Sequence, residues 1–341
     1  MDKKQNLSLN LLKCFSIFLI INSHADALYP AGIKFLATGG SIGNELFFLI
    51  SGYFFSAKDD MPSDIRRRFL RLYLPTYLML MIYGVFNQIQ LNGTGLSEYI
   101  RYFIWPTTFW FVGAVFLYFI ITYGLIRWNI SRSNPFLLFG FFIAVIDVLL
   151  YIFFIPDKDV WIVEDAFFYF VPYRSVYSIF AFVLGYFIKM NPEKFIGKVK
   201  ECFVIVFAMG SFLGFYVFKL CLNKNIVPMF LQIISHPLAI ICSFFIFLAF
   251  AQLNINEKFE GTKVGYGINV LSRLSLYSFL VQFILIDHVS LLDIVFPLNY
   301  ILCVVLVIIS AQALNVVTTK LLAIINSRTC LLYTSDAADE L

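Results

Sequence analysis

Apolar residues occur in this sequence as long runs that are separated by short polar connections. A helix needs about 20 mostly apolar residues to cross the roughly 30 Å hydrocarbon core of a bilayer. Runs of about that length predict ten membrane-spanning helices, at approximately 7–26, 36–57, 69–91, 107–127, 136–155, 174–189, 202–221, 230–252, 270–291 and 296–325. We therefore predict an all-α integral membrane protein in which residues 7–325 form a single transmembrane domain.

The distribution of charge indicates how these helices are oriented, because Lys and Arg accumulate on the cytoplasmic side of a membrane. With the N-terminus inside, 18 of the 25 basic residues lie in cytoplasmic segments and six lie outside. The remaining one, Lys13, is within the first predicted helix. An even number of helices then places both ends of the chain in the cytoplasm.

Composition supports the same class of protein. Apolar residues make up 60% of the chain and charged residues 13%, against about 25% charged residues in a soluble domain. The cysteines lie mostly in or beside apolar runs without paired spacing, so we interpret them as buried apolar residues. The sequence contains no Cys/His spacing typical of a metal site and no basic-aromatic patch, so neither a metal nor a nucleic-acid partner is expected.

Two ionisable residues lie in the first predicted helix, Lys13 and His24. Ionisable side chains inside a bilayer are energetically costly, so each one marks a candidate functional site. Their separation corresponds to about three helical turns and about 16 Å of rise, which places both side chains on one face. Lys13 would then lie toward the cytoplasmic leaflet and His24 toward the outer one. A snorkelling lysine and a histidine at the helix end are the alternative interpretations.

The second predicted helix contributes Glu45, which we expect in the outer half of the membrane within reach of His24. A carboxylate beside an imidazole fixes the tautomer of the ring and stabilises its protonated form, as in the general bases of acyl transfer. Gly43 and Gly52 allow either a neighbouring helix or a ligand to approach closely, and the sequence does not distinguish close helix packing from ligand binding.

Basic residues also gather at the cytoplasmic end of the third predicted helix. Arg68, Arg71 and Pro75 follow i, i+3, i+7 spacing and share one face. Planar guanidinium groups suit phosphate binding. A cluster that only orients the helix and attracts anionic lipid is the alternative.

Other polar residues are weaker candidates. His236 and the pair Asp287-His288 are predicted at the outer boundary. Either could enter an acceptor site, so position alone does not single out His24 as catalytic. Asp147 lies inside the fifth predicted helix, where we expect it to pair with a Tyr, Ser or Asn of a neighbouring helix.

Taken together and in order, these motifs resemble the membrane acyltransferase-3 family. The resemblance rests on the spacing of Lys13 and His24, on the segment 43–53 (GNELFFLISGY), and on Arg68 and Arg71 before Pro75. It extends to about residue 290 through Trp110-Phe111, through Arg174 with the segment 182–186 (FVLGY), and through the segment 272–282 (SRLSLYSFLVQ).

The resemblance implies a multi-pass enzyme of the bacterial cytoplasmic membrane. It would move an acyl group, expected to be acetyl, from cytoplasmic acyl-CoA (acetyl-CoA) to a hydroxyl of a cell-envelope glycan or lipid-linked sugar. By the same resemblance His24 would be the catalytic base, and Lys13, Arg68 and Arg71 would bind the donor. We add Glu45 as the residue that orients His24. An acyl-histidine intermediate is the other route open to His24.

The sequence departs from the family pattern at several positions. Asn10 and Glu45 stand where aspartate is common, Lys13 stands where arginine is usual, and Gln282 stands where histidine is frequent. Lysine keeps the charge of arginine but loses its bidentate fork, so donor geometry could differ. Gln282 removes a possible second titrating group.

A different class of function is also compatible with ten helices. The leading alternative is a transporter or flippase for a lipid-linked saccharide, and a structural or sensory membrane protein is a third. A transporter commonly shows repeats and Gly- or Pro-broken helices in matching halves, a pattern that we do not find in this sequence. Transfer of a labelled acetyl group distinguishes the enzyme from the transporter.

The last residues, 330–341, abruptly lose the membrane pattern and resemble a translated transposase sequencing adapter. We therefore expect this tail to be non-native and leave it out of the functional reasoning.

Overall fold

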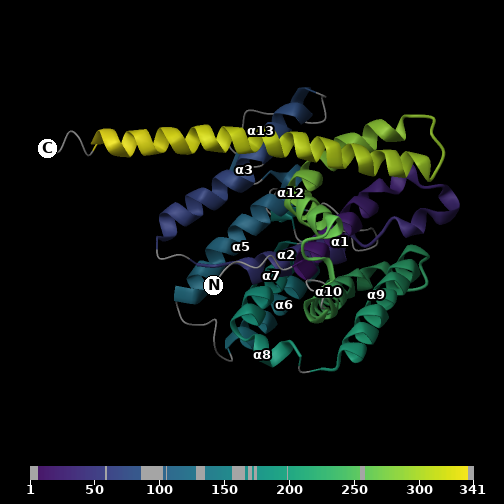
Figure 1. Cartoon of the computed structure of the whole chain (residues 1–341). Helices are drawn as coiled ribbons and strands as arrows, with labels where there is room; N and C mark the ends of the chain where they lie inside the picture. Colours follow the sequence, from purple (N-terminus) through teal and green to yellow (C-terminus); the bar gives the residue numbers. More distant parts are fainter. Residues whose placement is uncertain are drawn as a thin grey trace.

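The computed structural model describes residues 7–57, 60–85, 103–104, 106–127, 135–155, 166–167, 171–172, 175–197, 199–253 and 258–336. Helices form nearly all of the regular structure in these ranges (Figure 1). The α-helices there are α1 (Leu7–His24), α2 (Gly40–Phe54), α3 (Met61–Val85), α5 (Trp110–Arg127), α6 (Pro135–Phe154), α7 (Ser175–Met190), α8 (Pro192–Phe195), α9 (Glu201–Asn223), α10 (Ser235–Gln252), α12 (Lys263–Ser290) and α13 (Leu298–Asp336).

Short elements connect several of these helices. They are the 3-10 helices η1 (Ala25–Leu28), η2 (Ala31–Leu36), η4 (Thr107–Phe109) and η6 (Met229–Ile234) and an antiparallel pair of two-residue strands, β1 (Ala166–Phe167) and β2 (Val171–Pro172). Both η1 and η2 follow α1 and carry the chain to the start of α2, and η6 leads directly into α10.

The prediction of an all-helical membrane protein is confirmed. Each of the ten predicted ranges overlaps one α-helix. In the described ranges, six helical segments are long and apolar enough to cross a membrane, and most of α6 and all of α7 are shorter apolar helices. The other two predicted ranges correspond to α2, which has 15 residues, and to α3, whose first half carries four arginines. The chain is thus a multi-pass membrane protein, while the count of ten crossings stays a prediction.

Two helices begin well before the apolar runs that predicted them. The run at 69–91 corresponds to α3, which begins at Met61, and the run at 270–291 corresponds to α12, which begins at Lys263. Thr262 caps α12 by accepting a hydrogen bond from the backbone N–H of Gly265 at 3.1 Å. Polar first turns of this kind carry no hydrophobic signal, so a search for apolar runs misses them.

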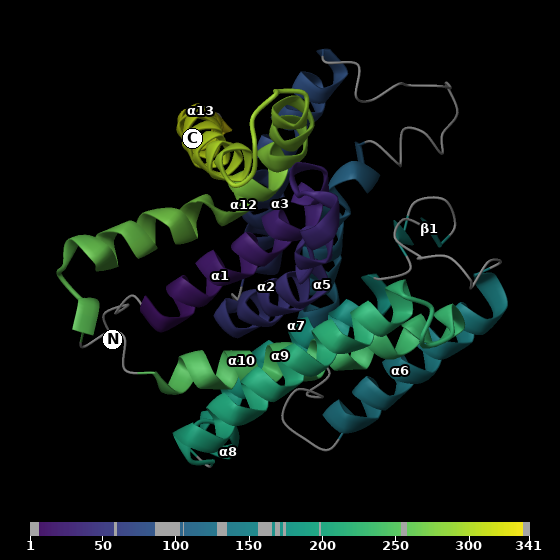
Figure 2. The same ribbon diagram turned by 90° about the vertical axis from the view of Figure 1, so that its right-hand side faces the viewer.

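The helices form one bundle with α2 near its middle (Figures 1 and 2). Helix α2 contacts α1, α7 and α10, while α12 lies between α1 and α13 and α9 pairs with α10. The longest helix, α13, runs along one edge of the bundle, and its last turns extend beyond the other helices (Figure 1). This helix continues through residues 330–336, and the remaining tail residues lie outside the described ranges.

Small residues set how closely α2 approaches its neighbours. A β-carbon at Gly43 would lie 2.7 Å from the carbonyl oxygen of Ser16 in α1. On the α7 side, a β-carbon at Gly185 would lie 1.9 Å from the carbonyl oxygen of Leu49. Of the two interpretations of Gly43, close helix packing is therefore the one found, as is usual for glycines between membrane helices.

Candidate active site

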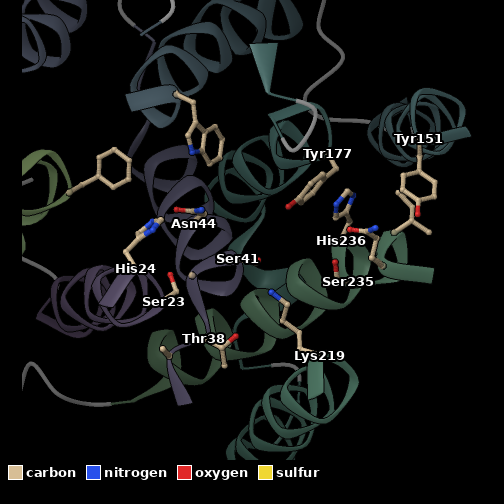
Figure 3. Close-up of a pocket in the computed structure, with 16 residues that line it drawn as sticks. Ser23, His24, Thr38, Ser41, Asn44, Tyr151, Tyr177, Lys219, Ser235 and His236 are labelled. Atoms are coloured by element: carbon tan, nitrogen blue, oxygen red, sulfur yellow. The ribbon is translucent and has the colours of Figure 1, made fainter. Parts of the chain in front are cut away.

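A polar pocket of about 250 Å³ opens at the end of α1 where the chain turns toward α2. Residues from α1, α2, α5, α6, α7, α9, α10 and α12 surround it, together with the turns before α2 and α10 (Figure 3). Its polar lining residues are Ser23, His24, Thr38, Ser41, Asn44, Tyr151, Tyr177, Lys219, Gln232, Ser235 and His236. Hydroxyl, amide and imidazole groups of this kind suit a ligand that carries hydroxyl groups.

His24, the last residue of α1, forms one side of this pocket. Its ring meets the ring of Phe283 in α12 edge to face, with a centroid separation of 4.6 Å. Asn44 of α2 lies beside it on the pocket wall (Figure 3), and its buried Oδ1 atom accepts no hydrogen bond within the described part of the chain. Asn44 thus brings a buried amide oxygen without a described hydrogen bond to the wall of the pocket.

His236, at the start of α10, lies on the opposite side of the pocket (Figure 3). Its Nδ1 atom is 2.9 Å from Oδ2 of Asp147 in α6. The ring stacks on Tyr177 of α7 with a centroid separation of 3.8 Å and an interplanar angle of 17°. Asp147 was expected to pair with a Tyr, Ser or Asn, and the partner described for it is His236, which was only a weaker candidate in the sequence.

The predicted contact between Glu45 and His24 is not found. Glu45 is buried and accepts a hydrogen bond of 2.5 Å from the hydroxyl of Ser178 in α7. Gly43 faces α1, and two residues further along a helix the side chain points to nearly the opposite side. Glu45 therefore lies between α2 and α7, while Gly40, Ser41 and Asn44 are the residues of α2 that line the pocket with His24.

At the other end of α1 and α2, cations gather around residues 54–56. The Nζ atom of Lys13 lies 4.5 Å from the centre of the Phe54 ring. Arg68 of α3 lies 4.7 Å from the Phe55 ring and donates a hydrogen bond of 2.9 Å to the carbonyl oxygen of Ser56. The C-terminal end of a helix carries partial negative charge, which favours cations there. We call Lys13, Arg68 and Lys189 the inner cluster.

Lys189, near the end of α7, is the member of the inner cluster that sequence reasoning did not select. Its Nζ atom donates a hydrogen bond of 2.5 Å to the carbonyl oxygen of Phe55. The available signal was its place at the predicted cytoplasmic end of the sixth span. That signal does not distinguish it from the many other basic residues on the same side.

Asp64 holds the arginines of α3 in place. It accepts hydrogen bonds from Arg67, from Tyr123 of α5 and, at 2.8 Å, from Nε of Arg68. Asp64 precedes the apolar run of α3. Burial alone would raise the pKa of this carboxyl, but the bonds from Tyr123 and Arg68 and the charge of Arg68 hold the pKa below its ordinary value.

Arg71 and Gln282, two other residues singled out from the sequence, lie away from these groups. Arg71 is exposed on α3 and interacts electrostatically with Tyr277 of α12, so no described contact joins it to the inner cluster. Gln282 is fully buried in α12. Its amide group makes no hydrogen bond within the described ranges. The Nδ1–H group of His288 donates a hydrogen bond of 2.7 Å to the carbonyl oxygen of Ile284 in its own helix, and His288 does not line the pocket. Arg174 lies outside the described residues.

Comparison of the chain with known proteins identified one protein family. A family model described as an acyltransferase domain, Acyl_transf_3, matches residues 6–318. No curated protein and no solved structure matches the chain. The match spans α1 through about the first half of α13 and includes both sides of the pocket and the inner cluster.

Proposed function

The chain belongs to the acyltransferase 3 family, and from that membership we propose that it moves an acyl group from cytoplasmic acyl-CoA to a hydroxyl of a cell-envelope glycan or lipid-linked sugar. We expect the group to be acetyl. We place the protein in the bacterial cytoplasmic membrane, with ten crossings and the N-terminus inside.

The observation that supports this proposal most directly is that one helix, α1, connects the inner cluster with the polar pocket. Lys13 of α1 belongs to the inner cluster and His24 of the same helix lines the polar pocket. They are separated by about 16 Å along one helical face. Coenzyme A carries several phosphate charges and a long, thin pantetheine arm, so its charged end suits the cluster while its thioester reaches toward the pocket.

The inner cluster has the chemistry that a phosphate-bearing donor requires. The Arg68 side chain is 18% exposed and is held by Asp64, Ser56 and two aromatic rings, Phe55 and Phe119. A guanidinium whose geometry is fixed in advance loses less entropy when it binds phosphate. Arg71 is proposed to assist from the exposed surface of α3.

In the pocket, His24 is proposed to act at the reacting centre. It takes the proton of the acceptor hydroxyl as that oxygen attacks the thioester carbonyl, or it first accepts the acyl group itself. The hydroxyl-binding lining of the pocket supports a sugar-like acceptor in either case. The catalytic role of Glu45 stays a prediction from the sequence that the experiment on Glu45→Gln decides, because its described hydrogen bond is with Ser178.

The test uses purified protein, radiolabelled acetyl-CoA and an envelope fraction from a strain that lacks the gene. We expect label to enter that fraction with the unchanged protein and to be lost with His24→Ala. His288→Ala is the matched control, because His288 is the histidine that does not line the pocket. Equal labelling by folded His24→Ala protein would remove His24 from the mechanism, and movement of a saccharide without acyl transfer would favour a transporter.

A further inference from the structure

The pairing of His236 with Asp147 is the carboxylate–imidazole arrangement that the sequence predicted for His24 and Glu45. The Nδ1 atom of His236 is 2.9 Å from the carboxylate. A carboxylate at that distance holds the proton on Nδ1 and leaves Nε2 with a lone pair. The side chain of His236 lines the pocket, so a ligand bound there lies against this ring.

The surroundings of His236 fix its ring more firmly than a single hydrogen bond does. Tyr177 covers one face of the ring. A second cavity, which is lined mainly by apolar residues of α6, α7 and α10, shares Tyr177, Ile233 and His236 with the polar pocket. Asp147 lines this apolar cavity and not the polar pocket. His236 therefore stands between its carboxylate and the ligand site, which is how a general base is usually oriented.

The two histidines of the pocket differ in these respects. His24 ends the helix that starts at the inner cluster, and its expected carboxylate partner faces α7 instead. His236 lies across the pocket from it, next to Ser235, and is bonded to a carboxylate (Figure 3). The side of the pocket that receives the donor along α1 is thus not the side that carries the oriented base.

From this geometry we propose that His236, oriented by Asp147, binds the acceptor hydroxyl and takes its proton, and that His24 carries the acyl group between donor and acceptor. The inference rests on the proposed function, because it divides that reaction between the two histidines. His236 is a catalytic residue in this scheme and Asp147 is a positioning residue.

The reaction then proceeds in two balanced steps. In the first, the unprotonated ring nitrogen of His24 attacks the thioester carbonyl, a C–N bond forms, the C–S bond breaks and CoA leaves as its thiolate. In the second, the acceptor oxygen attacks the acyl carbon, a C–O bond forms and the C–N bond breaks. The hydroxyl proton passes to Nε2 of His236 and from there to water or to the thiolate. The net products are the acyl ester and CoA thiol.

The test separates the two steps with purified full-length protein and radiolabelled acetyl-CoA. The first step is measured without acceptor, as a burst of CoA thiol of about one equivalent per protein. The second is measured as label transferred to an envelope fraction from a strain that lacks the gene. The key variant is His236→Asn, because its amide nitrogen can still donate to Asp147 while the Nε2 base is gone.

We expect folded His236→Asn protein to keep the burst within about threefold and to lose transfer by about 100-fold or more, the usual contribution of a general base. His24→Ala should lose both steps, and His288→Asn should lose neither. A loss of transfer below about tenfold in His236→Asn, or loss of its burst together with transfer, would overturn the role of His236. An unchanged protein that transfers label without a burst would overturn the carrier role of His24.

Two further measurements separate chemistry from structure. Added imidazole should restore part of the transfer in His236→Ala, because it can occupy the space left by the ring, and failure to rescue a folded variant would count against the base. Asp147→Asn should slow transfer by about tenfold or more and add nothing to His236→Asn in the double variant. Additive losses would overturn the pairing. If the unchanged protein shows neither burst nor transfer, the proposed function itself fails.

Discussion

Gly52 of α2 lies so close to Phe182 of α7 that a β-carbon at position 52 would be 1.8 Å from the carbonyl oxygen of Phe182. No flexible side chain can move aside to relieve such a contact, because the facing atom belongs to the backbone. The distance between α2 and α7 therefore depends on the absence of a side chain at this position. Since Glu45 and Ser178 meet across the same pair of helices, the glycine contact also determines where the carboxylate lies.

We expect Gly52→Ala to destabilise the protein, by about 1–3 kcal/mol or more, as overpacking does. The measurement is thermal unfolding of the purified protein in detergent. Gly214→Ala in α9 is the matched control, because a β-carbon there meets no atom within 4 Å. Equal unfolding temperatures for the two variants would show that α2 and α7 are not held as closely as described.

Replacement of Glu45 separates a packing role from a catalytic one. Glu45→Ala removes the acceptor of the Ser178 hydroxyl and should cost about 1–3 kcal/mol. Glu45→Gln keeps an oxygen at that place, so we expect it to fold normally and, because Glu45 faces α7 rather than His24, to keep transfer within about tenfold of the unchanged protein. Stability is measured as above and transfer with labelled acetyl-CoA. A folded Glu45→Gln protein without activity would instead support the predicted catalytic carboxylate.

If the inner cluster binds the donor, we expect a change at Arg68 to weaken donor binding specifically. Arg68→Lys keeps the charge but not the planar fork that reaches Asp64 and Ser56 together. We expect KM for acyl-CoA to rise about tenfold, or about 1.4 kcal/mol, with little change in the rate at saturating donor. Arg273→Lys is the control, because Arg273 bonds to its own helix at the carbonyl oxygen of Asn269. An unchanged KM in Arg68→Lys would place the donor elsewhere.

Asp64 predicts how stability depends on pH. Its pKa is lowered in the folded protein by bonds from Tyr123 and Arg68, against the effect of burial. The carboxylate therefore contributes its full stabilisation at pH values above the ordinary carboxyl range, and this contribution is lost as the pH falls through the lowered folded pKa. Unfolding temperatures measured from neutral to acidic pH should fall for the unchanged protein more steeply than for Asp64→Asn. Parallel curves would contradict the bonding of Asp64 to the arginines.

The sequence by itself determined the features that depend on one helix at a time. Each of the ten apolar runs falls on an α-helix of the described chain, because burial in a bilayer requires a minimum length of apolar chain. The period of a single helix aligned Lys13 with His24, and the structure places one at the inner cluster and the other in the pocket. The family resemblance was likewise confirmed, since it rests on residue order and spacing.

Only the tertiary structure decided which faces of different helices meet. The rotation of α2 is set by Gly43 against α1 and Gly52 against α7, and this rotation directs Glu45 to Ser178 and Asn44 to the pocket. His236 and Asp147 are 89 positions apart on α10 and α6, and no local period relates them. Lys189 likewise belongs to the inner cluster through a contact between two helices, its hydrogen bond to the carbonyl oxygen of Phe55. Contacts between helices follow from side-chain packing over the whole bundle, so a pattern read along one helix predicts which residues share a face but not what that face touches.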